Sequence, residues 1–504
     1  MLSTLIKLCA FLCVVCAFYF IMPKGRRWYV LLAGNLLFYL GFGNDFFLFL
    51  CIAIVTTYVG GRLLDKQSDV YAKQSKTITD KKEKKRYKEQ TLRKKRWILF
   101  VCLVINLGLW AFLKCSELIV VFGISYYSFV ASGYLIDVYR GRYKSEKNIL
   151  RLSTFLSFFL HMIQGPFSRY DEVQESMFAD NDFSKERLYD GGMRILWGIF
   201  KKCLIADKLS VCVTSIYATY EQLNGAYIFI AMILFGIQLY ADFSGYMDIM
   251  LGFARILGIH MAENFRQPFF ARSIEEFWRR WHITLGAWFK NYLFYPVSMG
   301  KWAQKIGVKS RKLLGNRTGR LIPSYMALLL VWSATGLWHG FATHYWMWGM
   351  MQMFVIVFSM QMESVYQRIH EVTKISAEGK LYTVFQCIRT FLLFCFMEIM
   401  SEAATVRDAW NMYAKMFTEM SVRSWSQLDI QVFQLGVTEM GVVLLGICMM
   451  LVVDLLKENN KSIKAIILQI PVLPRYMIYV GISYLILIMC IGSTSTGGFM
   501  YARF

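Results

Sequence analysis

Long apolar stretches separated by short polar segments make up most of the chain. The first runs from Leu2 to Met22 and is followed by a basic cluster, Pro23 to Arg27, without a small-residue cleavage site. We therefore predict an uncleaved first membrane span and not a signal peptide. Most of the later stretches have about 17 to 25 residues, the length that a helix needs to cross a bilayer. Together they predict about eleven to thirteen spans, the later ones near residues 28–43, 46–64, 98–114, 118–136, 149–167, 191–218, 225–258, 322–341, 344–361, 381–400, 435–456 and 475–493.

Two of these segments leave alternatives open. Segment 191–218 has charged residues in its middle, so it either crosses the bilayer or lies along its interface. Segment 225–258 is long enough for one helix or for two shorter ones. Because no internal repeat and no appended soluble domain is visible in the pattern, we expect a single all-α membrane domain over residues 1–504. The charged residues of the first segment are Lys201, Lys202, Asp207 and Lys208.

Two strongly basic segments interrupt the apolar pattern. Residues 65–97 hold thirteen Lys and Arg but five Asp and Glu, and residues 301–320 hold seven basic residues and no acid. Such segments stay out of lipid and are retained in the cytoplasm by the positive-inside effect. We interpret 65–97 as a cytoplasmic loop, helical or disordered, that fixes the topology. Counting spans from it places residues 24–27 and 140–147 on the same side and the N-terminus outside.

The composition agrees with membrane embedding and argues against a soluble, a nucleic-acid-binding or a disulfide-rich protein. Of the 504 residues, 56% are hydrophobic and only 18% are charged, against roughly a quarter in soluble domains. The net charge of +22 comes from the loops. The positive-inside effect explains this charge more simply than nucleic-acid binding does, so we predict no nucleic-acid partner. The twelve cysteines lie mostly inside apolar runs, where thiols pack as small hydrophobes. The Cys13 and Cys16 pair lacks the context of a redox or metal motif.

His339 is the first candidate for chemistry, because ionisable groups in apolar spans are costly and are retained mainly for function. It lies between Gly336 and Gly340, a small-residue face on which a second helix or a ligand can approach closely. A buried imidazole there would stay neutral and could accept a proton. The alternative is a core histidine satisfied by one hydrogen bond.

Segment 273–288 is the second candidate. Trp278, Trp281, Leu285 and Trp288 recur at helical spacing, which predicts one amphipathic helix at the membrane interface with His282 at the border of the stripe. Paired acids and arginines flank the stripe. Asp242 and Asp248 are acids within another apolar region, where such groups usually hold helices together.

Several enzyme signatures are absent from the sequence. No histidine is followed five positions later by aspartate, and no Gly-x-Ser-x-Gly elbow or phosphate-binding Gly-x4-Gly-Lys-Ser/Thr loop occurs. His339 and His344 are five residues apart, on different helix faces, so we predict no metal site and no permanent cofactor.

Taken together, the motifs resemble the membrane-bound O-acyltransferase (MBOAT) family, and within it the bacterial branch similar to alginate O-acetyltransferase membrane subunits. Each block is weak alone, but their order and spacing are specific. They are Gly123-Ile-Ser-Tyr-Tyr127, Tyr134-Leu-Ile-Asp-Val-Tyr-Arg-Gly141, Gln164-Gly-Pro166 with Arg169-Tyr170, Lys201-Lys202 with Ala206-Asp207, Asp242-Phe-Ser-Gly-Tyr246, Glu263-Asn-Phe265, Arg272-Ser273 with Glu276 to Ile283, Gly336-Leu-Trp-His-Gly340 and Phe499 to Phe504.

The resemblance implies helices around a tunnel in which an acyl donor from one side meets an acceptor from the other. By position, His339 matches the invariant histidine of the family and His282 its second conserved polar residue. One departure stands out: Ser401-Glu402-Ala403 replaces an aromatic-Arg-Ala triplet, which puts any contact of that arginine in doubt. The spacing from Lys114 to Gly123 is also short for the branch.

The resemblance therefore implies an O-acyltransferase of the bacterial cell membrane. Its donor would be a cytoplasmic thioester, acetyl-CoA by preference, and its acceptor an extracytoplasmic polysaccharide, reached directly or through a partner acetyltransferase. D-alanyl transfer to teichoic acid from a carrier protein stays open, as does a transporter or flippase of another class. For catalysis we select His339 and His282, and as candidates for binding the donor Trp338, Arg279, Arg280 and Asp242.

Overall fold

The computed structural model describes residues 2–42, 45–116, 123–162 and 164–491. Within these ranges the chain is helical, and the extended pairing is limited to one isolated antiparallel bridge between Phe265 and Trp281. The all-α fold class is thus confirmed. The terminal Phe499 to Phe504 block and most of the stretch between Lys114 and Gly123 lie outside the described residues.

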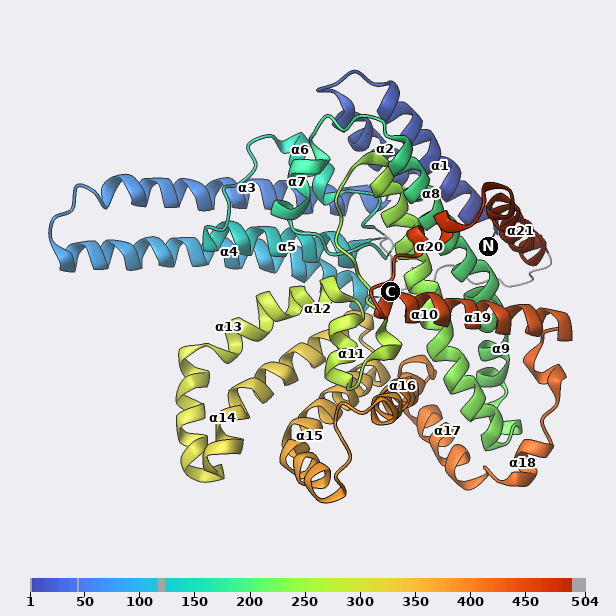
Figure 1. Cartoon of the computed structure of the whole chain (residues 1–504). Helices are drawn as coiled ribbons and strands as arrows, with labels where there is room; N and C mark the ends of the chain where they lie inside the picture. Colours follow the sequence, from blue (N-terminus) through green and yellow to red (C-terminus); the bar gives the residue numbers. More distant parts are fainter. Residues whose placement is uncertain (1, 43–44, 117–122, 163, 492–504) are drawn as a thin grey trace. The chain divides into compact units, whose positions relative to one another are not determined.

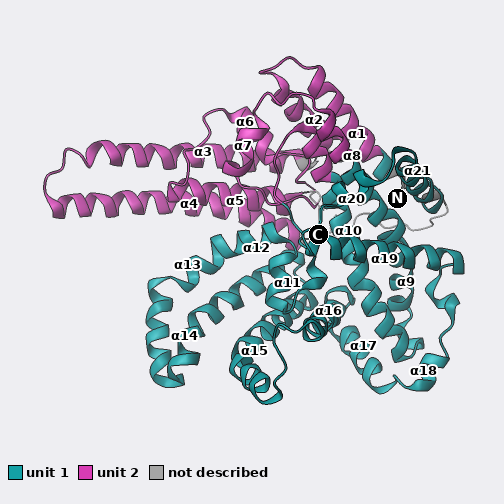
Figure 2. Ribbon diagram, viewed as in Figure 1, with its two compact units in different colours: residues 1–6, 193–249, 263–504 teal, residues 7–192, 250–262 magenta. Residues whose placement is uncertain are grey.

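The chain divides into two compact units, which Figure 2 distinguishes by colour. Unit 2 comprises residues 7–192 and 250–262, and unit 1 comprises residues 1–6, 193–249 and 263–504. Helices that lie wholly or mainly in unit 2 are α1 (Leu2–Ile21), α2 (Arg27–Phe42), α3 (Asp45–Gln74), α4 (Lys81–Ser116), α5 (Ile124–Arg140), α6 (Ile149–Leu156) and α7 (Tyr170–Met177) (Figure 1).

Unit 1 contains the remaining helices, although α8 begins and α10 ends in unit 2. They are α8 (Lys185–Phe200), α9 (Asp207–Ala218), α10 (Gly225–Leu257), α11 (Ile274–Arg280), α12 (Ile283–Phe289), α13 (Tyr295–Ser298), α14 (Lys301–His339), α15 (Thr343–Thr373), α16 (Lys380–Glu402), α17 (Val406–Thr418), α18 (Val422–Ser426), α19 (Val437–Glu458), α20 (Ile463–Gln469) and α21 (Val472–Ile491) (Figure 1).

Long apolar helices account for seven of the predicted spans within the described residues. Among the described residues, seven helices are long and apolar enough to cross a membrane, and a shorter apolar helix covers Leu5–Ile21. Several predicted spans are shorter or interrupted elements: α2 and α5 have 16 and 17 residues, and segment 149–167 leaves the helix after Leu156. The protein is a multi-pass membrane protein. Its seven long apolar helices are Phe47–Gln74, Lys81–Cys115, Gly225–Leu257, Lys301–His339, Lys380–Glu402, Val437–Glu458 and Val472–Met489.

The two ambiguous segments have different outcomes. Segment 225–258 forms one helix of 33 residues, α10, so the two-helix alternative is wrong. Segment 191–218 forms the end of α8, a wider π-helical turn at Lys201–Ala206, and then α9. The two lysines at the start of this turn, Lys201 and Lys202, are buried within the protein, where a charge without a partner is costly.

Both basic segments are helical. Residues 65–97 extend α3 and α4 beyond their apolar parts into a pair of helices that lie side by side (Figure 1). Gly60 of α3 packs against Cys102 of α4, and the rings of Tyr71 and Tyr87 stack at 5.8 Å. The second basic segment reverses direction at Gly315, whose φ of 79° suits glycine, so that Gly307 packs against Pro323.

Candidate active site

The segment that carries His282 is not one continuous helix, so that prediction is wrong. It breaks into α11 and α12, with Trp281 extended and His282 in the left-handed region at φ 46°. Trp278 and Trp281 pack against protein instead of forming an interfacial stripe: the ring of Trp278 lies 5.0 Å from that of Trp332, and Trp281 is 2% exposed.

Asn264 holds this break in place. Its backbone oxygen accepts a hydrogen bond from Ile283 N at 3.0 Å. Its side-chain Oδ1 accepts bonds from the backbone N of Thr284 at 3.0 Å and from Thr284 Oγ1 at 2.9 Å, while Nδ2 donates to the sulfur of Met247 at 3.3 Å. A non-glycine residue in the left-handed region is strained and persists only when its surroundings over-determine it. Asn264 supplies that constraint for His282.

The same amide selects the tautomer of His282. Nδ1 lies 3.3 Å from Oδ1 of Asn264. Because the backbone N–H of Thr284 can only donate, the atom that it contacts must be the amide oxygen, and His282 Nδ1 therefore carries a proton. Burial of the ring, which is 4% exposed as a residue, lowers the pKa of His282 to about 3. His282 is thus neutral at physiological pH, with its lone pair on Nε2.

His339 is the last residue of α14 and is only partly buried, whereas the sequence predicted a buried ring within a span. The centroid of its ring lies 4.8 Å from that of Trp338 and 4.8 Å from that of Trp348. Trp338 also contacts His282, with ring centroids 5.9 Å apart. The structure therefore places the two histidines against the same buried indole.

The small-residue face around His339 is confirmed. A Cβ on Gly336 would lie 2.6 Å from the carbonyl oxygen of Tyr345, and one on Gly340 would lie 2.6 Å from the ring of the same residue. A Cβ on Gly349 of α15 would likewise lie 2.4 Å from the carbonyl oxygen of Trp332. These glycines let α14 and α15 meet closely enough to hold Trp348 against His339.

We expect Gly336→Ala to destabilise the protein by about 1–3 kcal/mol, because the new methyl group meets backbone that must move. The unfolding midpoint of the purified variant in detergent measures this effect. Gly441→Ala is the matched control, since a Cβ there meets no atom within 4 Å. An unchanged midpoint for Gly336→Ala would show that the contact between α14 and α15 is looser than described.

A buried acid that our sequence prediction did not select completes this region. Glu398 of α16 accepts a hydrogen bond from Trp348 Nε1 at 2.9 Å and one from Ser401 Oγ at 2.9 Å. It is 3% exposed. The rule that an ionisable group within an apolar span has a function would have identified it, because it lies in predicted span 381–400. Glu398 orients the indole that contacts His339.

The two arginines that are candidates for donor binding differ in how firmly ion pairs within the protein hold them. Arg280 is held by Glu276 and by both carboxylate oxygens of Glu458, at 2.7 and 2.9 Å. Arg279 pairs with Glu275 at 2.6 Å, but both side chains are about 60% exposed, and such surface pairs contribute little. Arg279 and Trp338 therefore stay candidates for donor binding, whereas Arg280 joins α11 to α19.

Asp242 belongs to a buried ion network. It pairs with Lys202, whose Nζ also lies 2.9 Å from Asp207. Asp248 accepts bonds from Lys201 Nζ at 2.7 Å and from Arg194 Nε at 2.9 Å. The interpretation of both acids as groups that hold helices together agrees with these contacts, which join the π-helical turn to α10.

The other histidines lie in different surroundings. His161 is buried and bonded to Ser168 Oγ at 3.1 Å, whereas His260 is exposed. His344 is partly buried, with its ring 4.1 Å from that of Tyr345, and His370 bonds the carbonyl of Ile375. Within the described ranges, no group of three or more His, Cys, Asp or Glu side chains is arranged to hold a metal ion.

The sequence matches the model of one protein family, MBOAT, the membrane-bound O-acyltransferase family, over residues 80–401, which include both candidate histidines. The chain belongs to the MBOAT family. It is 30% identical over 331 residues to a probable alginate O-acetylase AlgI of Azotobacter vinelandii, covering 66% of this chain and 60% of that protein. It is 32% identical over 210 residues to a peptidoglycan O-acetyltransferase of Helicobacter pylori, covering 41% of this chain and 36% of that protein.

A third relative in the MBOAT family is a teichoic acid D-alanyltransferase of Bacillus subtilis, which is 25% identical over 304 residues, 57% of this chain and 72% of that protein. The chain spans about 60% of the length of the alginate relatives that it matches.

Proposed function

We propose that the protein transfers an acyl group, acetyl by preference, from a cytoplasmic thioester to a hydroxyl of an extracytoplasmic polysaccharide, directly or through a partner acetyltransferase. The observation that carries this proposal is the position of His282 and His339 on one buried indole within the MBOAT match. The names of the alginate and peptidoglycan relatives support an acetyl group and a polysaccharide acceptor.

In the proposed reaction His339 acts as the general base. It takes the proton of the attacking hydroxyl while the oxygen bonds to the carbonyl carbon; the carbon–sulfur bond then breaks and the departing thiolate receives the proton. General-base assistance contributes typically about 10²–10⁴ in rate. As the last residue of α14, His339 lies at the carbonyl end of the helix dipole, which stabilises the positive charge that the ring acquires.

The tautomer of His282 limits which hydrogen bonds its ring can make to the substrates. With the proton on Nδ1, Nε2 can accept a hydrogen bond but cannot donate one to the carbonyl oxygen of a thioester. A ring with a pKa of about 3 also holds protons poorly. We therefore assign His282 to accept a hydrogen bond at Nε2 from the acceptor hydroxyl or from His339. This role positions the proton donor and does not orient the donor carbonyl.

The proposal includes the orientation of the chain in the membrane and the routes by which donor and acceptor reach the site. The basic parts of α3 and α4 would face the cytoplasm, and the N-terminus would face outward. The donor would enter from the cytoplasm and the acceptor from the other side, through the tunnel that the family resemblance implies. Trp338 and Arg279 are the residues that we propose to contact the donor.

A donor comparison tests the reaction class. Membrane vesicles that contain the chain, with labelled acetyl-CoA added to the cytoplasmic face, are expected to transfer label to a polysaccharide acceptor. D-alanyl transfer is the second candidate because of the Bacillus subtilis relative. Label transferred from a D-alanyl carrier protein, but not from acetyl-CoA, would select that second candidate. Solute transport that persists after loss of both His282 and His339 would instead support a transporter.

A further inference from the structure

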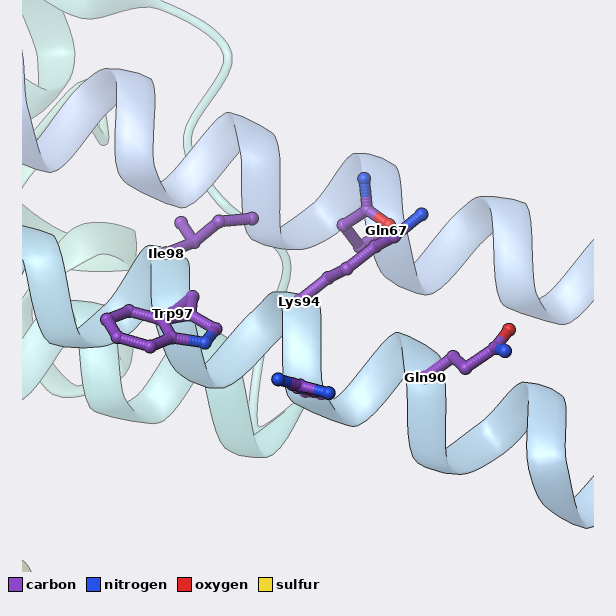
Figure 3. Close-up of a pocket in the computed structure, with 6 residues that line it drawn as sticks. Gln67, Gln90, Lys94, Trp97 and Ile98 are labelled. Carbon is purple, nitrogen blue, oxygen red and sulfur yellow. The ribbon is translucent and has the colours of Figure 1, made fainter.

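A cationic groove lies on the pair formed by α3 and α4, within unit 2. It is lined by one glutamine of α3 and five residues of α4, and Figure 3 shows Lys94 extending toward Gln67 of the neighbouring helix. The lining residues are Gln67, Gln90, Arg93, Lys94, Trp97 and Ile98. The lining thus combines two cations, two amides and two apolar side chains, and it contains no acid.

The two cations of the groove are available to a ligand. Arg93 and Lys94 are exposed, and in the part of the chain that the structure describes neither forms a salt bridge with a carboxylate. Their neighbour Lys95 differs, because its Nζ donates to the carbonyl of Tyr139 at 3.0 Å and lies over the ring of the same residue. Arginine and lysine placed together without an acid favour an anionic group, phosphate above all.

The groove also lies where α4 changes from polar to apolar. Trp97 is 59% exposed and begins an outward-facing stripe that continues through Phe100, Val101 and Val104. Tryptophan at such a border is typical of a membrane–water interface, with cations on its aqueous side. A ligand that fits both halves has an anionic headgroup attached to hydrocarbon chains.

We propose that this groove binds the headgroup of an anionic diacyl phospholipid, of the phosphatidylglycerol kind, with its acyl chains along the exposed stripe of α4. A zwitterionic lipid would bring its own cation beside Arg93 and Lys94. A soluble phosphate compound would make no use of Trp97 and the stripe. The proposal does not depend on the acyl-transfer reaction.

Native mass spectrometry of the full-length protein in detergent, titrated with phosphatidylglycerol or phosphatidylcholine, tests the site. Each cation near an anionic membrane surface contributes roughly fivefold in affinity, so R93Q with K94Q is expected to weaken phosphatidylglycerol binding by about 10- to 30-fold. The matched control, K84Q with K85Q, removes the same charge from exposed positions of α4 outside the groove and should leave the tightest site intact.

A neutral variant separates the site from general charge attraction. Trp97→Ala should weaken phosphatidylglycerol binding without changing net charge, and circular dichroism with the unfolding midpoint confirms that each variant is folded. Equal loss in the groove and control variants, or no loss in either, overturns the proposal. So does saturable binding of acetyl-CoA or inorganic phosphate that requires Arg93 and Lys94, which would make the groove a site for a soluble anion.

Discussion

Replacing His339 with alanine is expected to lower acyl transfer by about 10²–10⁴-fold while leaving the protein folded. The ring is only partly buried and lies at the end of α14, so its removal leaves no large internal cavity, whereas the reaction loses its base. The measurement is transfer of label from the thioester in membrane vesicles, normalised to the amount of protein.

His370→Ala is the matched control for His339→Ala. His370 lies in the last turn of another long helix, α15, where its Nδ1 bonds the carbonyl of Ile375. It has no role in the proposed reaction. Its substitution should leave activity within about twofold, in line with the small effects of most surface changes. Wild-type transfer by His339→Ala at equal abundance contradicts the assignment of the base.

Substitution of Asn264 is expected to have the second largest effect, about 10- to 100-fold in kcat with a smaller change in KM for the donor. Asn264→Ala leaves the Thr284 N–H and hydroxyl without their acceptor and removes the oxygen that fixes Nδ1–H of His282. Asn264 is thus a positioning residue. Kinetics of the purified variant in vesicles measure the kcat and KM split.

Asn264→Asp separates positioning from mere structural support. The carboxylate keeps an oxygen for the same donors, but its charge would raise the pKa of His282 from about 3. The variant should therefore keep more activity than Asn264→Ala above the raised pKa and lose it as pH falls through that value, because the ring becomes protonated at Nε2. Identical pH profiles for wild type and Asn264→Asp would show that the amide does not control this ring.

The sequence pattern predicted features that depend on neighbouring residues and missed those set by distant ones. Gly336 and Gly340 lie four apart on α14, so the close approach to α15 could be predicted from spacing. The break at His282 could not, because its cause is Asn264, eighteen residues earlier, together with the bridge from Phe265 to Trp281. The local 3,4,3 spacing of apolar residues favoured an unbroken helix there.

Not every predicted span forms a long apolar helix, for a related reason. Hydropathy alone does not distinguish a helix that faces lipid from a short one that packs inside the protein. The apolar stretch 149–167 illustrates this: α6 ends at Leu156, and Phe158, Phe159 and Leu160 are buried in protein without continuing a helix. Buried side chains and lipid-facing side chains produce the same apolar pattern.

The pairing of Lys201 and Lys202 constrains how the chain enters the membrane during synthesis. Their carboxylate partners include Asp242 and Asp248 of α10, which the ribosome makes some forty residues later. An ammonium group without a counter-ion is costly in hydrocarbon. Lys202 also has Asp207 within its own segment, whereas the carboxylate partner of Lys201, Asp248, comes only with α10. We therefore expect residues 193–218 to reach their final depth only after α10 lies beside them.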